Sequence, residues 1–108
     1  MRMDAEARFD EIVEDLAPRG VLPGALFGAR SMTVEGTAFA CLKGGQLAVR
    51  LGAGTVAHTD ALALAGASLF DPSGKGRPFK DWVAVPAEES GTWGRLAEAG
   101  LDALGGAA

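Results

Sequence analysis

Residues 34–51 read VEGTAFACLKGGQLAVRL, a stretch in which short apolar segments alternate with glycine-containing turns. In its last segment Leu47, Val49 and Leu51 alternate with other residues, which is the period of a strand with one buried face. Turn signals at 35–36 and 43–45 separate this segment from the two before it. The stretch therefore predicts a three-stranded antiparallel meander over 26–34, 37–42 and 46–51, with Phe39 and Cys41 on one face of the central strand.

The segment before the meander has the pattern of an amphipathic helix. From residue 4 to residue 16 apolar side chains recur at helical spacing, and acidic side chains occupy the other faces. Asp4 is a suitable N-cap, and a proline and a glycine shortly after residue 16 predict the end of the helix. Pro23-Gly24 is then expected to prolong the connection to the first strand.

After the meander the sequence predicts two more helices and two more strands. Thr55 is a suitable N-cap for a weakly amphipathic helix that contains Val56 and Leu62, and a glycine at position 66 predicts its end. The elements expected in this half are a helix over about 54–65, a short strand over 68–70, an irregular segment over 71–78, a strand over 82–85 and a helix from about 88–90 to 104.

This order of elements predicts a single α+β domain over residues 1–108. Its architecture would be two-layered, with an antiparallel sheet of about five strands and three helices packed mainly on one face. The residues expected in the core are the apolar members of each periodic pattern: Phe9, Ile12, Phe39, Val49, Leu51, Val83, Val85, Trp93, Leu96 and Leu101.

Composition is that of an ordinary globular protein, with 48% apolar and 22% charged residues among 108. The one cysteine, Cys41, cannot form an internal disulfide, so a reducing cytoplasm is the expected location. The first residues turn acidic at once and lack the apolar stretch of a signal peptide. No apolar run approaches the roughly 20 residues that span a bilayer, so no membrane contact is expected.

Charge is distributed unevenly along the chain, whose net charge is -4. The middle, residues 16–80, is basic, whereas residues 1–15 and 81–108 are both acidic. Overall acidity and acidic flanks argue against direct nucleic-acid binding, although a local basic patch remains in the middle.

The inventory of reactive side chains does not predict an enzyme. The chain has one histidine, one cysteine and no tyrosine, and no serine lies in a nucleophile-elbow pattern. His58 has no partners nearby in the sequence, so a structural or surface role is expected for it. A lone histidine with carboxylates on a solvated helix face does not make a metal site, and no cofactor is expected.

The strongest local feature is the basic loop, residues 72–80, which precedes Trp82. It holds two glycines and the cations Lys75, Arg77 and Lys80. The spacing differs from that of a Walker A loop, and no helix follows directly. Two interpretations stay open. The loop is either a connection kept soluble by its charges and anchored by Phe79 and Trp82, or a contact site that uses the basic residues.

Several segments resemble the N-terminal domain of TfoX/Sxy proteins, a family of competence regulators. The similarity lies in Leu26-Phe27-Gly28, in the hairpin 34–40, in the strand 47–51 and most specifically in the run from Gly74 to Val83, and it covers about residues 5–104. It implies a two-layer α/β domain and a link to regulators that act with the transcription machinery. The full regulators carry a second, C-terminal helical domain and this sequence ends at Ala108, so we expect a stand-alone copy.

The family offers no established catalytic residues, so function is expected from the surface. Our first hypothesis is a non-enzymatic regulatory domain that contacts a protein partner, linked to transcription regulation, through the open sheet face or the basic loop. The alternative is a small-molecule or anion-binding domain. A homodimer is compatible with either hypothesis. The candidate contact residues are Arg50, Lys75, Arg77, Lys80 and Trp82.

Overall fold

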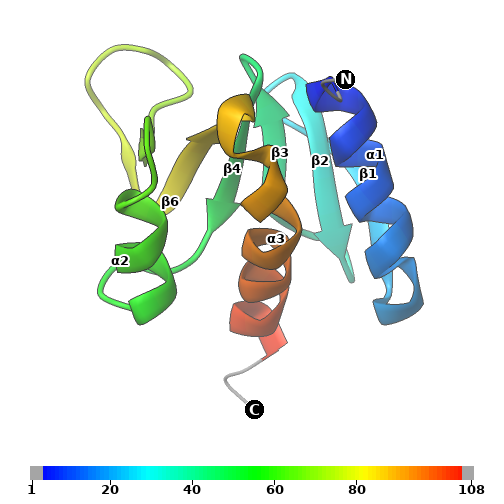
Figure 1. Cartoon of the computed structure of the whole chain (residues 1–108). Helices are drawn as coiled ribbons and strands as arrows, with labels where there is room; N and C mark the ends of the chain where they lie inside the picture. The colour runs from blue at the N-terminus through cyan, green and yellow to red at the C-terminus, as the bar shows by residue number, and fades with distance from the viewer. Residues whose placement is uncertain (1–3, 106–108) are drawn as a thin grey trace.

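The computed structural model describes residues 4–105; residues 1–3 and 106–108 lie outside the described part. Three α-helices lie against the sheet, and short 3-10 turns, η1 (Ala17–Arg19) and η2 (Ala87–Glu89), follow α1 and precede α3 (Figure 1). The helices are α1 (Ala5–Leu16), α2 (Val56–Leu62) and α3 (Ser90–Gly105). The strands are β1 (Val21–Leu26), β2 (Ala29–Val34), β3 (Thr37–Lys43), β4 (Gln46–Arg50), β5 (Ser68–Phe70) and β6 (Phe79–Pro86).

The six strands form one antiparallel sheet in the order β1-β2-β3-β4-β6-β5. This confirms the predicted α+β architecture, with one strand more than the expected five. The prediction of one strand over 26–34 was wrong, because the chain reverses at Phe27-Gly28 and Pro23-Gly24 belongs to β1 instead of a loop. The meander β1 to β4 is therefore four-stranded.

A β-bulge in β3 overturns a second expectation. The register between β2 and β3 shifts next to Met32, so that Met32 pairs with Ala40 and Thr33 with Ala38. The extra residue, Phe39, turns to the same core as Ala40, whereas Cys41 belongs to a separate cluster. Phe39 and Cys41 therefore do not share a face, because a bulge interrupts the alternation on which the prediction depended.

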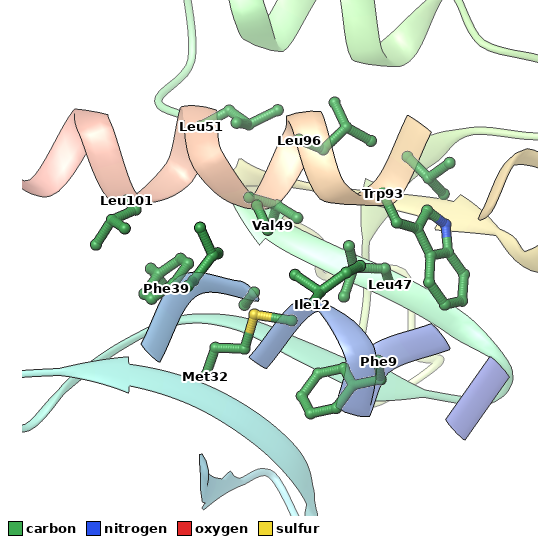
Figure 2. Close-up of a cluster of buried hydrophobic side chains, with 14 of the residues drawn as sticks. Phe9, Ile12, Met32, Phe39, Leu47, Val49, Leu51, Trp93, Leu96 and Leu101 are labelled. Atoms are coloured by element: carbon green, nitrogen blue, oxygen red, sulfur yellow. The ribbon is translucent and has the colours of Figure 1, made fainter. Parts of the chain in front are cut away.

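The main core lies between the helices and one face of the sheet (Figure 2). Phe9 and Ile12 of α1 and Trp93 of α3 are at most 1% exposed. They meet apolar side chains of β2, β3 and β4 such as Met32 and Leu47. All ten predicted core residues are buried, which confirms the helical and strand periods used to choose them.

A smaller second cluster covers the other face of the sheet and consists of strand residues alone. Its buried members are Cys41, Ala48, Phe70, Trp82 and Ala84, and Leu26 packs against them. The strand β4 is thus buried on both faces, not on one as its alternation suggested. Ala48 is small enough to let aromatic rings lie over the strand.

Cap residues match their predictions better than the weak second helix does. Asp4 accepts a hydrogen bond from the amide of Ala7 at 2.7 Å, and Thr55 Oγ1 accepts one from the amide of His58 at 3.1 Å. However, Val56 is 78% exposed, and α2 turns His58 and Ala61 inward instead. The helix was weakly amphipathic in sequence because its inward residues are small or polar.

Helix α3 packs closely against the sheet at Gly100. A Cβ atom added there would lie 2.6 Å from Val49 Cγ1 and 3.3 Å from Phe39 Cδ2. Glycine is thus required by space and not by backbone conformation, and it sets how tightly α3 packs on β3 and β4. Within residues 4–105, no helix has both the length and the apolar character needed to cross a bilayer.

Candidate functional site

The β5–β6 connection, residues 71–78, is organised around one carboxylate. Asp71 accepts hydrogen bonds from Ser73 Oγ at 2.9 Å, from the amide of Gly74 at 3.1 Å and from the amide of Gly76 at 2.8 Å. Both glycines have positive φ values of 69° and 75°, which a residue with a Cβ adopts only at a cost. The glycines therefore shape the loop around Asp71.

This arrangement changes what the loop can bind. Desolvation acts to raise the pKa of Asp71, but the hydrogen bonds from Ser73 and from the amides of Gly76, Gly74 and Arg77 outweigh it and hold the pKa below its usual value. The amides that could have cradled an anion already bind this internal carboxylate. An anionic ligand would have to be held by side chains.

Within residues 4–105, the cations of the basic loop differ from most other cations in having no ion-pair partner. Arg8 pairs with Glu11, Arg30 with Asp10, and Arg19 with Asp102 at 2.6 Å. In the part of the chain that the structure describes, the side chains of Lys75, Arg77 and Lys80 make no ion pair or hydrogen bond, and all three residues are exposed. Their charges are available to an incoming anionic group.

The remaining candidates, Arg50 and Trp82, differ from the loop cations in pairing or exposure. They are cross-strand neighbours on β4 and β6. Arg50 Nη2 lies 4.0 Å from Asp81 Oδ2, so its charge is partly balanced. Trp82 is only 9% exposed, because it packs in the second cluster beneath the surface. Among the five candidates, only the three loop cations are both exposed and without an ion pair within residues 4–105.

An aromatic cluster, comprising Phe27, Phe70, Phe79 and Trp82, adjoins the basic loop. The ring of Phe27 lies 5.3 Å from that of Phe79 and 6.0 Å from that of Phe70. Phe70 in turn lies 6.0 Å from Trp82. The cluster joins the β1–β2 turn to β5 and β6 at the opposite edge of the sheet, so the sheet must curl to bring the two together.

Two rings of the aromatic cluster reach the surface. Phe27 and Phe79 are each 40% exposed, whereas Phe70 is 5% exposed. Phe79 is next to Lys80 in the chain, and Lys43 Nζ donates to the carbonyl oxygen of Phe27 at 3.2 Å. Lys43 is thus held next to Phe27, and Phe79 lies within two residues of Arg77 and Lys80 in the chain. Phe27 could not be recognised as a site residue from the sequence, because the aromatic rings that it contacts lie more than forty residues away in the chain.

Phe27 also adopts an unusual backbone conformation. The turn Phe27-Gly28 has φ values of 55° and 72°, the type I′ pattern that favours Asn-Gly or Gly-Gly. A left-handed conformation costs a residue with a Cβ about 1 to 2 kcal/mol. Glu35 has the same conformation at φ 50° in the next turn, with a charged side chain in solvent. At Phe27 the conformation instead presents an apolar ring beside the basic loop.

His58 holds the base of the basic loop in place. It is 7% exposed, and its Nε2 lies 2.7 Å from the carbonyl oxygen of Lys80. This bond joins α2 to the first residues of β6, so the histidine has a structural position, as expected. Since it is buried and hydrogen-bonded, its removal should loosen the end of the loop, which the sequence did not indicate.

Within residues 4–105, two surface hollows bear on whether reactive side chains come together at the basic loop, and neither brings them together there. One of about 260 Å³ lies between the β3–β4 turn and the start of the loop, with Lys43, Phe70 and Asp71 in its lining. A larger one of about 670 Å³ lies near Leu101, where the charged groups Arg19 and Asp102 are already paired. The first is smaller than typical ligand pockets, which measure roughly 300 to 1,000 Å³.

Groups suited to catalysis or metal binding do not converge on this surface. Over residues 4–105, no three histidine, cysteine, aspartate or glutamate side chains come close enough to hold a metal ion. Burial raises the pKa of the Cys41 thiol to about 11, against a smaller opposing effect of Lys43. At neutral pH this thiol is protonated and buried, which is the reverse of a nucleophilic cysteine.

Comparison with protein-family models and with curated proteins finds no match for this chain.

Proposed function

We propose that this chain is a non-enzymatic interaction domain that contacts a protein partner through the basic loop and the exposed rings beside it. The observation that supports this most directly is the contrast in pairing: Lys75, Arg77 and Lys80 are exposed and unpaired within residues 4–105, whereas four other arginines face carboxylates. The resemblance to TfoX/Sxy N-terminal domains supports a regulatory role and a partner linked to transcription regulation.

The open sheet face is a weaker site for this contact than the basic loop. On that face Phe70 and Trp82 are buried together with Cys41, Ala48 and Ala84, so these residues of the sheet are not open to a partner. A partner would meet the rings of the aromatic cluster and the cations next to them. Charges around an apolar centre are typical of protein-binding surfaces.

Capture from a native lysate tests this proposal. Wild-type protein and the variant K75A/R77A/K80A are immobilised, and the retained proteins are identified by mass spectrometry. At least one protein should be retained by the wild type and lost with the triple variant, and its retention should weaken as salt rises. Retention of the same proteins by both would overturn the proposal.

Arg95→Ala is the matched control. Arg95 is an exposed cation of α3 that has no ion pair within residues 4–105, as with the loop cations. Its replacement lowers the positive charge without touching the basic loop. It should leave capture unchanged, and an equal loss in this variant would indicate nonspecific attraction by charge.

The alternative function is binding of a phosphate-bearing small molecule by the same three cations. Their lack of partners favours it, although the amides of Gly74 and Gly76 are already used by Asp71. For a polyphosphate held by three ion contacts, the slope of log K against log salt should be about -2 to -3. Titration with tripolyphosphate measures it, and a slope near zero would contradict this alternative.

A further inference from the structure

The exposed rings indicate more about the partner than the cations alone do. Phe27 and Phe79 are both 40% exposed, and their rings lie 5.3 Å apart at an interplanar angle of 55°. Phe27 lies on the β1–β2 turn at one edge of the sheet, and Phe79 begins β6, the strand next to β5 at the opposite edge. These two adjacent, partly exposed rings form an apolar patch from which a partner can exclude water.

The conformation of Phe27 strengthens this argument. With φ values of 55° and 72°, the turn would be served best by Asn-Gly, and glycine at position 27 would also fit. A phenylalanine there keeps an unfavourable backbone state and leaves two-fifths of its surface in water. Strained backbone of this kind clusters at binding sites, where the presented side chain is used.

Charge identifies the chemistry that would accompany an apolar group on this patch. Lys80 follows Phe79 directly, Arg77 lies two residues before it, and Lys43 contacts the carbonyl oxygen of Phe27. Lys43 is held at Phe27 by a hydrogen bond, and the exposed cations of the basic loop make no ion pair within residues 4–105, so negative charge on a partner that buries the two rings would be favourable. An acidic peptide with one large apolar side chain combines both features.

Single-stranded nucleic acid also combines negative charge with flat apolar groups, but the ring geometry favours it less. The ring planes of Phe27, Phe70 and Phe79 meet at 55°, 57° and 85°. Successive bases stack on aromatic faces that follow the strand, and these rings do not offer such a series. The chain's net charge of -4 further opposes a polyanion.

We infer that Phe27 and Phe79 receive a large apolar side chain from an acidic segment of a partner protein, while Arg77, Lys80 and Lys43 bind the acidic residues that flank it. This inference rests on the proposed function and adds the chemistry of the partner to it. Phe27 is then a contact residue, and the left-handed turn presents its ring to the partner.

Two synthetic peptides of 14 residues test this inference. Both are rich in Asp and Glu; one carries a single central phenylalanine and the other a serine in its place. Fluorescence anisotropy of the labelled peptides measures their binding to wild-type protein. The phenylalanine peptide should bind at least fivefold more tightly than the serine peptide. Equal binding of both, or no binding of either at millimolar protein, would overturn the inference.

Phe27→Asn is the decisive variant, because asparagine suits the turn and removes the ring. It should weaken binding of the phenylalanine peptide at least fivefold and leave the serine peptide within twofold. Phe27→Gly also fits the turn and should act in the same way if the asparagine variant folds poorly. Val56→Asn is the control, since Val56 is 78% exposed on α2, and it should bind both peptides as wild type does.

The loop variant K75A/R77A/K80A separates failure of this inference from failure of the proposed function. It should weaken both peptides at least tenfold. If it does so while Phe27→Asn has no effect, the cations bind the partner and the ring does not, which overturns the inference alone. If both peptides bind the loop variant normally, the proposed function fails as well.

A separate titration with nucleic acid tests the choice of a protein partner. Tighter binding of a twelve-nucleotide oligothymidylate than of either peptide would overturn that choice.

Discussion

The two faces of the sheet are built on different principles. On the helix side, large apolar residues such as Phe39 and Trp93 are 0% exposed, and arginines near α1 are paired with carboxylates. On the other side, small residues such as Cys41 and Ala48 pack with Phe70 and Trp82. The adjoining rings of Phe27 and Phe79 reach solvent near the basic loop, whose cations have no ion pair within residues 4–105. The helix side packs large apolar side chains into the main core, whereas the other side leaves two aromatic rings partly exposed next to the basic loop.

Truncation of Phe39 should show the largest effect on the helix side. Phe39 is 0% exposed in the main core, so Phe39→Ala should lower the free energy of unfolding by about 3 to 5 kcal/mol. Phe79→Ala, on the other side, removes a ring that is 40% exposed and should cost clearly less. Urea denaturation of both variants measures the difference, and equal losses would contradict the contrast between the faces.

Ionisation of Cys41 should destabilise the second cluster at high pH. Its folded pKa is raised from 9.0 to about 11, so stability is fully present below pH 9 and is lost as pH rises toward 11. Two pKa units correspond to a loss of about 2.7 kcal/mol. The chain has no tyrosine to titrate in this range. Denaturation of wild type and Cys41→Ala at pH 8 to 11 tests this, and identical pH profiles would refute it.

A methyl group at Gly100 should destabilise the protein although alanine is the better helix former. The added Cβ would lie 2.6 Å from Val49 Cγ1, and overpacking of this kind costs about 1 to 3 kcal/mol. Gly91→Ala is the matched control in the same helix, because nothing lies within 4 Å of its added Cβ. That variant should be neutral or more stable by up to about 1 kcal/mol. Thermal melts compare the two, and a stabilised Gly100→Ala would show that α3 can move away.

The loop cations should matter least to folding. Because Lys75, Arg77 and Lys80 are exposed and unpaired in the described part of the chain, K75A/R77A/K80A should change the free energy of unfolding by less than about 0.5 kcal/mol. The same variant is expected to lose its partner. Chemical denaturation beside the capture experiment checks both statements, and a large loss of stability would assign these residues a structural role.

Sequence periodicity predicted the helix side well because that side follows regular spacing. All ten expected core residues are buried, α1 begins directly after its expected N-cap Asp4, and α3 begins at Ser90, within the expected range 88–90. Errors arose where local geometry departs from the period. Phe27-Gly28 is not a common turn dipeptide, so β1 was missed, and the bulge at Phe39 reversed the expected relation to Cys41.

The candidate site was predictable only in part. The basic loop stood out in the sequence because three cations and two glycines lie close together. Its use of Asp71 as an internal acceptor, and the contact of Phe27 with Phe79, depend on how the chain folds back in space. Pairing of the other arginines also required the structure, since Arg19 and Asp102 are 83 residues apart. Without the structure, the loop cations could not be distinguished from the cations that are paired with carboxylates.

The proline in β1 has a consequence for self-association. The two-residue turn makes Leu26 and Ala29 the hydrogen-bonded closing pair, and bonded and non-bonded pairs alternate along the strands. Pro23 and Met32 therefore form a non-bonded pair, in which the backbone nitrogen of Pro23 points to the outer edge of the sheet. That nitrogen carries no hydrogen, so an added strand would meet a missing donor. At the opposite edge β5 is only three residues long. Both edges resist pairing with another copy, which protects this small sheet from growing into an aggregate.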